Sequence, residues 1–200
     1  MIPDPSRLSS LLASRICHDL INPIGAIGNG LELLVMSGTA GGGPELALIQ
    51  DSLLQANARL RFFRIAFGTT RQEQAIGRDE ILSILSDITA GSRLTVEWHI
   101  PDHLPRREAK LAFLLILCLE TMLPQGGRIR LDRRDDSWTL RAESLRLRPV
   151  PDLWAMVQDW TKETEVEPGQ VQFLVVRDEA QAQGRNLRIT ALPDAVEISF

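Results

Sequence analysis

His18 lies in the run Arg15-Ile16-Cys17-His18-Asp19-Leu20-Ile21-Asn22-Pro23, with an acid directly after it and a proline five positions on. Neutral imidazole is nucleophilic near neutral pH. A neighbouring carboxylate can accept the Nδ1 proton, which leaves Nε2 free to attack. Phosphoryl transfer passes through a loose transition state, so its main requirements are an in-line nucleophile and charge stabilisation. These residue types at this spacing predict a histidine that takes and gives a phosphoryl group.

The residues around His18 have the pattern of a long amphipathic helix. Apolar residues recur every three or four positions, and an acid followed by proline precedes them, which predicts a helix from Asp4-Pro5 to Ser37-Gly38. At about 100° per residue, His18 falls almost opposite the apolar stripe, and Asp19 falls on its flank. The stripe consists of Leu8, Leu12, Ile16, Leu20, Ile24, Ile27, Leu31 and Leu34, and the polar face around His18 of Ser14, Arg15, Asn22, Gly25 and Asn29.

Two residues near His18 have a direct bearing on phosphoryl chemistry. Asn22 follows one helical turn later and is placed to hydrogen-bond a phosphoryl oxygen. Pro23 removes the amide that would bond back to the Asp19 carbonyl, which favours a kink next to the site. The alternative stays open that His18 is an ordinary solvated surface histidine.

The glycines after Pro23 suggest a surface for a partner. Each glycine in a helix costs about 1 kcal/mol relative to alanine, so Gly25, Gly28 and Gly30 call for a reason. Gly25 lies on the side of His18, where a flat surface lets a partner approach closely, and we expect Arg15 and Asn29 to contribute to that surface. Tight helix packing is the other explanation, since Gly30 faces the apolar side.

A second helix is predicted from Leu46 to Phe67, after a glycine-rich turn near Gly41. Its apolar residues follow a heptad pattern that is typical of a helix in a bundle. A hairpin of two such helices exposes one long apolar side, so we expect two protomers to form a four-helix bundle. Antiparallel pairing places His18 level with Arg61 and Arg64. The arginines of the segment Arg59-Leu60-Arg61-Phe62-Phe63-Arg64 can steer an acidic partner or steady a phosphoryl group, or they are simply solvated.

The pattern changes after residue 68. A polar linker is expected over 69–77, and short helices and alternating strands follow it. Helices are predicted at 81–88, 110–122, 152–160 and 170–183, and strands at 94–100, 128–131, 137–142, 186–192 and 195–200. Such mixing implies an α+β layer. The sequence therefore predicts two domains, a helical hairpin over 1–68 and an α/β sandwich over 78–200.

Composition excludes several classes of function. Of the 200 residues, 44% are hydrophobic and 24% are charged, and the net charge of −4 argues against nucleic acid as a partner. The sequence has neither a signal-peptide pattern nor an apolar stretch approaching 18 residues, so no membrane association is expected. Cys17 and Cys118 lack metal-ligand spacing and favour a reducing cytoplasm. Pro101 breaks any helix between His99 and His103, which disfavours a metal site there.

The run from His18 to Pro23 resembles the H-box of dimeric sensor histidine kinases, in which an acid follows the phospho-accepting histidine and a proline lies five positions on. The resemblance implies His18 as the phospho-acceptor, Asp19 as the acid that orients it and Pro23 as a helix-bending residue. Residues 111–131, with the turn Pro124-Gln125-Gly126-Gly127, look like the N-box helix and following strand of the kinase ATP-binding domain.

The nucleotide-binding residues of such kinases have no match in this chain. Leu114 and Cys118 replace two asparagines that serve Mg²⁺ and phosphate, a role that leucine and cysteine cannot fill. The segment Glu143–Arg148 contains no glycine where the kinases have an Asp-x-Gly-x-Gly loop, and only Pro168-Gly169-Gln170 stands where a second glycine-rich loop is expected. We therefore expect a degenerate ATP-binding domain that binds neither ATP nor a metal cofactor.

These features together resemble the ChpT-type histidine phosphotransferases, strongly over residues 10–68 and by the order of elements beyond. The resemblance implies a homodimeric phosphorelay shuttle. His18 takes a phosphoryl group from the receiver domain of a hybrid histidine kinase and passes it to response-regulator receivers, while Mg²⁺ sits in the receiver's own acidic pocket. Two alternatives remain: an atypical ATP-dependent sensor histidine kinase, and a non-catalytic dimer that binds receivers and leaves His18 unused.

Overall fold

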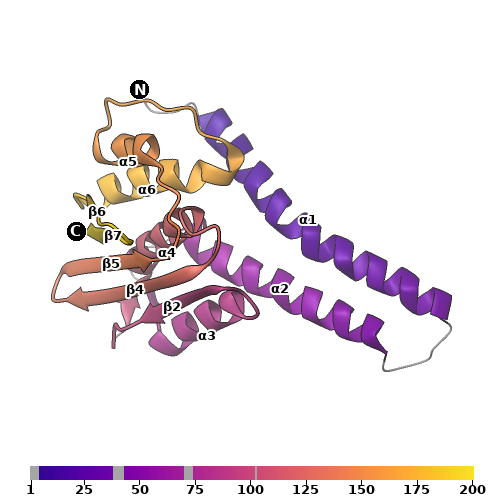
Figure 1. The fold of residues 1–200 in the computed structure, drawn as a ribbon. Coiled ribbons are helices and arrows are strands. Elements are labelled where there is room, and N and C mark those ends of the chain that lie inside the picture. Colours follow the sequence, from indigo (N-terminus) through magenta and orange to yellow (C-terminus); the bar gives the residue numbers. More distant parts are fainter. Residues whose placement is uncertain (1–4, 38–42, 70–73, 102) are drawn as a thin grey trace.

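The computed structural model of the chain describes residues 5–37, 43–69, 74–101 and 103–200. Two long helices, α1 (Pro5–Ser37) and α2 (Pro44–Ala66), run antiparallel and project together from a layer of sheet and shorter helices (Figure 1). The predicted helical hairpin is confirmed, and α1 continues as a helix through Pro23. The predicted N-cap Asp4 and the turn near Gly41 lie outside the described residues.

The second half of the chain forms a five-stranded mixed sheet in the order β2-β4-β5-β7-β6. The first pair is parallel and the other three pairs are antiparallel. A parallel pair requires a crossover connection, which α4 (Arg106–Thr121) supplies. The strands are β2 (Leu94–Trp98), β4 (Gly127–Arg134), β5 (Ser137–Glu143), β6 (Arg188–Ala191) and β7 (Ala195–Ser199).

In the described part of the chain, the helices cover one face of the sheet. Ile129 and Leu131 of β4 are buried, whereas Arg128 and Arg130 of the same strand are exposed. This alternation is typical of a sheet with one covered face, and it confirms the predicted α+β layer. The covering helices are α3 (Arg78–Thr89), α4, α5 (Pro151–Gln158) and α6 (Val171–Ala182), and a short 3-10 helix, η1 (Pro168–Gln170), leads into α6.

The turn between α4 and β4 depends on a glycine. Gly126 has a φ of +87°, which residues other than glycine rarely adopt. A Cβ at this position would also collide with the carbonyl oxygen of Arg93, which precedes β2. The turn therefore brings the start of β4 close to the start of β2, where the two strands begin their parallel pairing.

The end of α2 belongs to the same hydrophobic core as the sheet layer. Phe62, Phe63 and Ile65 are buried in one cluster with the apolar residues of α4 and the strands, and the rings of Phe62 and Phe113 lie 4.7 Å apart. The predicted linker over 69–77 contains a short strand, β1 (Ala75–Ile76), which pairs with β3 (Leu104–Pro105). The division of the chain into two domains stays a prediction.

The first turns of α1 also contact this layer, which the sequence analysis did not anticipate. Leu8, Leu11 and Ile16 are half-buried against the common core, and the start of α1 lies against η1 and α6 (Figure 1). Further along, α1 leaves the layer and pairs with α2. None of the described helices is long and apolar enough to cross a membrane.

Candidate functional site

His18 lies on α1 where the helix emerges from its contact with the sheet layer. Its side chain is 75% exposed, which confirms the predicted orientation toward solvent. Leu11, two turns earlier on nearly the same side of the helix, is packed against the core. The imidazole therefore lies where this face of α1 changes from packing against the core to facing solvent.

Asp19 forms a hydrogen bond with one ring nitrogen of His18. Nδ1 lies 3.1 Å from Oδ1 of Asp19, and because a carboxylate can only accept, Nδ1 carries the hydrogen of this bond. Asp19 itself is only 12% exposed, and its Oδ2 accepts a hydrogen bond from Nε of Arg15 at 2.9 Å. The pairing predicted for His18 and Asp19 is present, and it leaves Nε2 of the exposed ring available.

Asn22 borders a hollow of about 380 Å³ between α1 and α2. Asp19 and Pro23 of α1 line the same hollow, whose floor is formed by α2 and by the turn that follows α3. Asn22 is exposed, so its amide is available to a group bound beside His18. The residues contributed by α2 and by the α3 region are Gln55, Ala58, Arg59, Asp87, Ile88, Ala90, Gly91 and Ser92.

The three helix glycines differ in their surroundings. An added Cβ at Gly25 or Gly28 would meet nothing within 4 Å, so both positions present open surface. Asn29 is exposed on the same side as Gly25. A Cβ at Gly30 would lie 2.6 Å from Cγ1 of Ile49 on α2. Both explanations considered for the glycines therefore apply, packing for Gly30 and open surface for Gly25.

Arg61 and Arg64 both lie close to acids of α3. Arg61 pairs with Asp87 of α3, and Arg64 lies 3.7 Å from Glu80 of the same helix. Both arginines face α3 because that flank of α2 packs against it.

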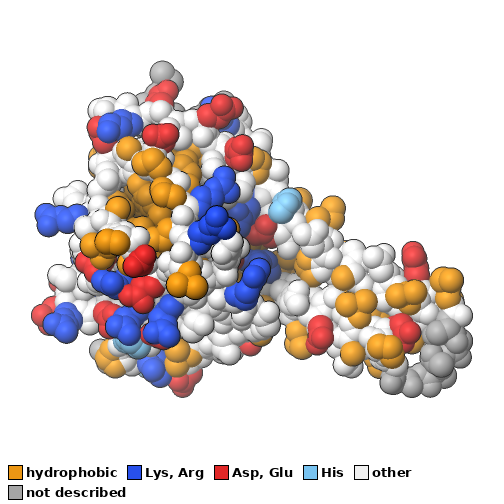
Figure 2. Space-filling model, viewed as in Figure 1, with side chains coloured by type: hydrophobic (Ala, Val, Ile, Leu, Met, Phe, Trp, Pro, Cys, Tyr) orange, Lys and Arg blue, Asp and Glu red, His pale blue; other side chains and the backbone are white. Residues whose placement is uncertain are grey.

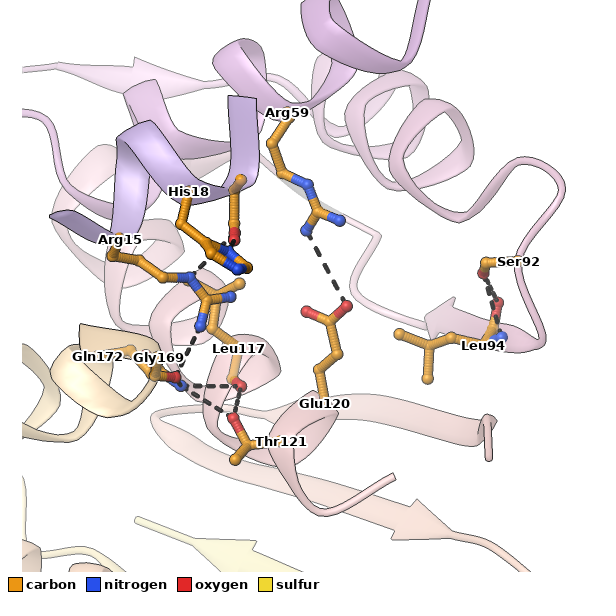
Figure 3. Close-up of polar contacts among 11 residues, drawn as sticks. Arg15, His18, Arg59, Ser92, Leu94, Leu117, Glu120, Thr121, Gly169 and Gln172 are labelled. Atoms are coloured by element: carbon orange, nitrogen blue, oxygen red, sulfur yellow. Dashed lines mark hydrogen bonds and ion pairs between the residues drawn. The ribbon is translucent and has the colours of Figure 1, made fainter. Parts of the chain in front are cut away.

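Arg59, the first arginine of the segment 59–64, lines the hollow beside Asp19. Its Nη1 lies 4.0 Å from Oε1 of Glu120 on α4, and Figure 3 shows the two side chains extended toward each other close to His18. Arg59 lies about 200° around α2 from Arg61, so the two arginines face different flanks of the helix.

Leu114 and Cys118, the residues at the predicted N-box positions, are both fully buried in the core. Burial raises the pKa of the Cys118 thiol well above its ordinary value, while the positive charge of nearby Arg15 acts in the opposite direction. Neither residue offers an oxygen ligand for Mg²⁺. Within the described part of the chain, no group of three or more His, Cys, Asp or Glu residues is placed to hold a metal ion.

The contacts of Arg15 also went unforeseen. Arg15 was expected to contact a partner, yet its side chain is only 15% exposed. Beyond its bond to Asp19, it donates from Nη1 to the carbonyl oxygen of Gly169 at 2.6 Å. Arg15 and Gly169 are 154 positions apart, and no local sequence pattern predicts a contact over that separation.

Comparisons with known proteins agree on a family. The profile of the family described as "Histidine phosphotransferase C-terminal domain" matches residues 78–195. The chain is 30% identical over 200 aligned residues to the protein phosphotransferase ChpT of Brucella abortus (strain 2308), covering 96% of this chain and 94% of that protein. A solved structure of a bacterial phosphotransferase is also 30% identical, with a TM-score of 0.79 over 100% of this chain and 98% of the other.

A more distant structure, that of the Acinetobacter baumannii histidine kinase AdeS, is 10% identical and has a TM-score of 0.44, covering 91% of this chain and 95% of that one. The family profile and the two relatives at 30% identity favour neither the sensor kinase nor the non-catalytic binder. Together with the exposed, acid-paired histidine, they show that the chain belongs to the ChpT-type histidine phosphotransferases, which act in two-component phosphorelays.

Proposed function

We propose that His18 accepts a phosphoryl group from the receiver aspartate of a hybrid histidine kinase and passes it to the receivers of response regulators. One observation carries this proposal: His18 is exposed, its Nδ1 is bound to Asp19, and its Nε2 is open. A phosphoryl donor on another protein can reach a nitrogen placed in this way without any opening of the chain.

The transfer step follows from the state of the ring. Nε2 attacks the phosphorus of an aspartyl phosphate, in line with the bond to the carboxylate oxygen. That P–O bond breaks, its electron pair stays on the receiver's carboxylate, and an N–P bond forms at Nε2. The ring gains a positive charge, which the Asp19 carboxylate stabilises through the Nδ1 hydrogen. Transfer to a second receiver reverses these changes, and no proton has to leave the ring.

The surroundings of His18 suit a phosphoryl group that arrives with its own protein. Asn22 and Arg59 border the hollow that Asp19, the residue after His18, also lines, so they supply an amide and a guanidinium for phosphoryl oxygens. In this proposal Mg²⁺ is held by the acidic pocket of the receiver, and this chain supplies no nucleotide or metal ligand. The open surface at Gly25 and Asn29 belongs to the docking site of the receiver.

We further propose a homodimer formed through α1 and α2. Ile24 and Leu31 of α1 are 58% and 50% exposed, and Leu53 and Leu60 of α2 are 51% and 49% exposed. Figure 2 shows hydrophobic side chains spread over the two projecting helices. Exposed apolar residues at heptad spacing on both helices fit a second copy of the hairpin, which would complete a four-helix bundle.

The decisive experiment supplies a phosphorylated receiver domain and Mg²⁺ and follows label on this chain. We expect acid-labile, alkali-stable label on the wild-type protein, none on His18→Ala, and unchanged label on His99→Ala, an exposed histidine away from the site. Incubation with ATP alone should give no label. His18-dependent labelling by ATP would establish the kinase alternative, and receiver binding without transfer would establish the non-catalytic dimer.

A further inference from the structure

Arg15 forms contacts in two directions, and both use donors of its guanidinium group. Nε donates to Oδ2 of Asp19 at 2.9 Å, on the carboxylate oxygen that His18 does not use. Nη1 donates to the carbonyl oxygen of Gly169 at 2.6 Å. The guanidinium is planar and its donors are fixed relative to each other. A fixed Gly169 carbonyl therefore also fixes where Arg15 holds the carboxylate of Asp19.

The Gly169 carbonyl is itself held in place by the sheet layer. Gln172 of α6 is fully buried, and its Nε2 donates to the same carbonyl at 3.0 Å and to Oγ1 of Thr121 on α4 at 2.9 Å. A capping box also stabilises the η1 turn: the side chains of Glu167 and Gln170 each accept a hydrogen bond from the other residue's backbone amide. Figure 3 shows this connected set of side chains running from His18 to α4.

From these contacts we infer that Arg15 is a positioning residue, through which Gln172 and the η1 turn hold Asp19 in the orientation that keeps Nδ1 of His18 protonated and Nε2 free. The inference rests on the proposed function of His18, and it assigns the sheet layer a part in transfer that is separate from docking. It replaces the expectation that Arg15 contacts a partner.

The chemistry explains why the orientation of Asp19 matters. With Arg15 on Oδ2, the other oxygen faces Nδ1 of the ring. Without Arg15, the carboxylate can rotate about its χ angles, and the imidazole can place its proton on Nε2 instead. That tautomer has no lone pair on the nitrogen that must attack phosphorus.

The test separates positioning from partner contact. Arg15→Met is compared with Arg7→Met, which removes an exposed arginine two turns earlier on the same helix. Two quantities are measured with a phosphorylated receiver: the single-turnover rate at saturating receiver and the dissociation constant. The ring ¹⁵N chemical shifts of His18 report its tautomer independently of any transfer.

We expect Arg15→Met to lower the saturated rate about tenfold or more, as expected for the loss of one charge-assisted hydrogen bond, and to leave the dissociation constant within about twofold. The ¹⁵N shifts should move toward the Nε2-protonated tautomer. Arg15→Lys keeps the charge but not the fork, so it should restore the rate only partly. Gln172→Met should act in the same direction as Arg15→Met, and Arg7→Met should match the wild type.

A weaker dissociation constant with an unchanged rate and tautomer would overturn the inference and return Arg15 to the role of a partner contact. Unchanged values throughout would reduce the Arg15–Asp19 pair to a local ion pair. If the wild-type protein takes no label while the ¹⁵N shifts of the variants move as expected, the proposed function fails and the positioning of His18 stands.

Discussion

Two glycines of α1, both in helical backbone, should respond in opposite ways to the same mutation. Gly25→Ala adds a methyl group where nothing lies within 4 Å. The helix should gain about 1 kcal/mol from the better propensity of alanine, which for a chain of this size raises the melting temperature by ~2–4 °C. This expectation depends only on the open surroundings of the position.

Gly30→Ala adds the same methyl group at a packed position. Its Cβ would lie 2.6 Å from Cγ1 of Ile49 and 3.4 Å from the carbonyl oxygen of Glu45. Overpacking of this kind costs about 1–3 kcal/mol, which offsets the gain of about 1 kcal/mol in helix propensity. The net effect ranges from neutral to a loss of about 2 kcal/mol, so the two variants should differ by at least about 1 kcal/mol.

Urea unfolding at one fixed protein concentration measures this difference, because unfolding of a dimer depends on concentration. A second readout is receiver affinity: Gly25→Ala should weaken receiver binding because the methyl group stands on the docking side of His18, and Gly30→Ala should not. Equal stabilisation by both variants would refute the close packing of α1 on α2 at Gly30. Unchanged affinity for Gly25→Ala would remove Gly25 from the docking surface.

Three further variants test other parts of the structure. Leu53→Glu should dissociate the dimer in analytical ultracentrifugation, because burying an unpaired charge costs several kcal/mol, whereas the exposed control Gln50→Glu should not; a dimeric Leu53→Glu would contradict the bundle. Asp19→Asn should slow transfer about tenfold to a hundredfold. Asp178→Asn, at an acid of α6 whose side chain is 42% exposed, should leave the rate unchanged. Burial raises the pKa of the Cys118 thiol, so as the pH rises the unfolded chain loses this proton before the folded chain does. The free energy of unfolding should therefore fall above pH ~8.5, by up to ~1.4 kcal/mol per pH unit. Urea titrations at several pH values should show that Cys118→Val abolishes this slope.

The helices and most strands could be predicted because their residues are periodic. The stripe from Leu8 to Leu34 and the alternation in residues 128–131 have local physical causes, and both elements form as expected. The two-residue pairing of β1 with β3 could not be foreseen. Segments that short have no periodicity, and they become strands only when the fold brings them together.

The site was predictable to the same extent. His18 and Asp19 are neighbours in sequence, so their contact follows from local geometry. The roles of the arginines depend on which helix covers which flank of α2, and a one-dimensional pattern contains no such information. Arg61 therefore bonds to α3, and Arg59 takes the place beside the hollow.

The hydrogen bond at Nδ1 of His18 affects the order in which phosphoryl donors and acceptors can bind. Because Nδ1 is bound to Asp19, each protomer offers a single reactive atom, approached from a single side. In the proposed relay, donor and acceptor receivers therefore compete for this one atom and bind one after the other. The dissociation of the first receiver then limits the rate at which the second can bind. An abundant unphosphorylated receiver would therefore inhibit transfer by occupying His18.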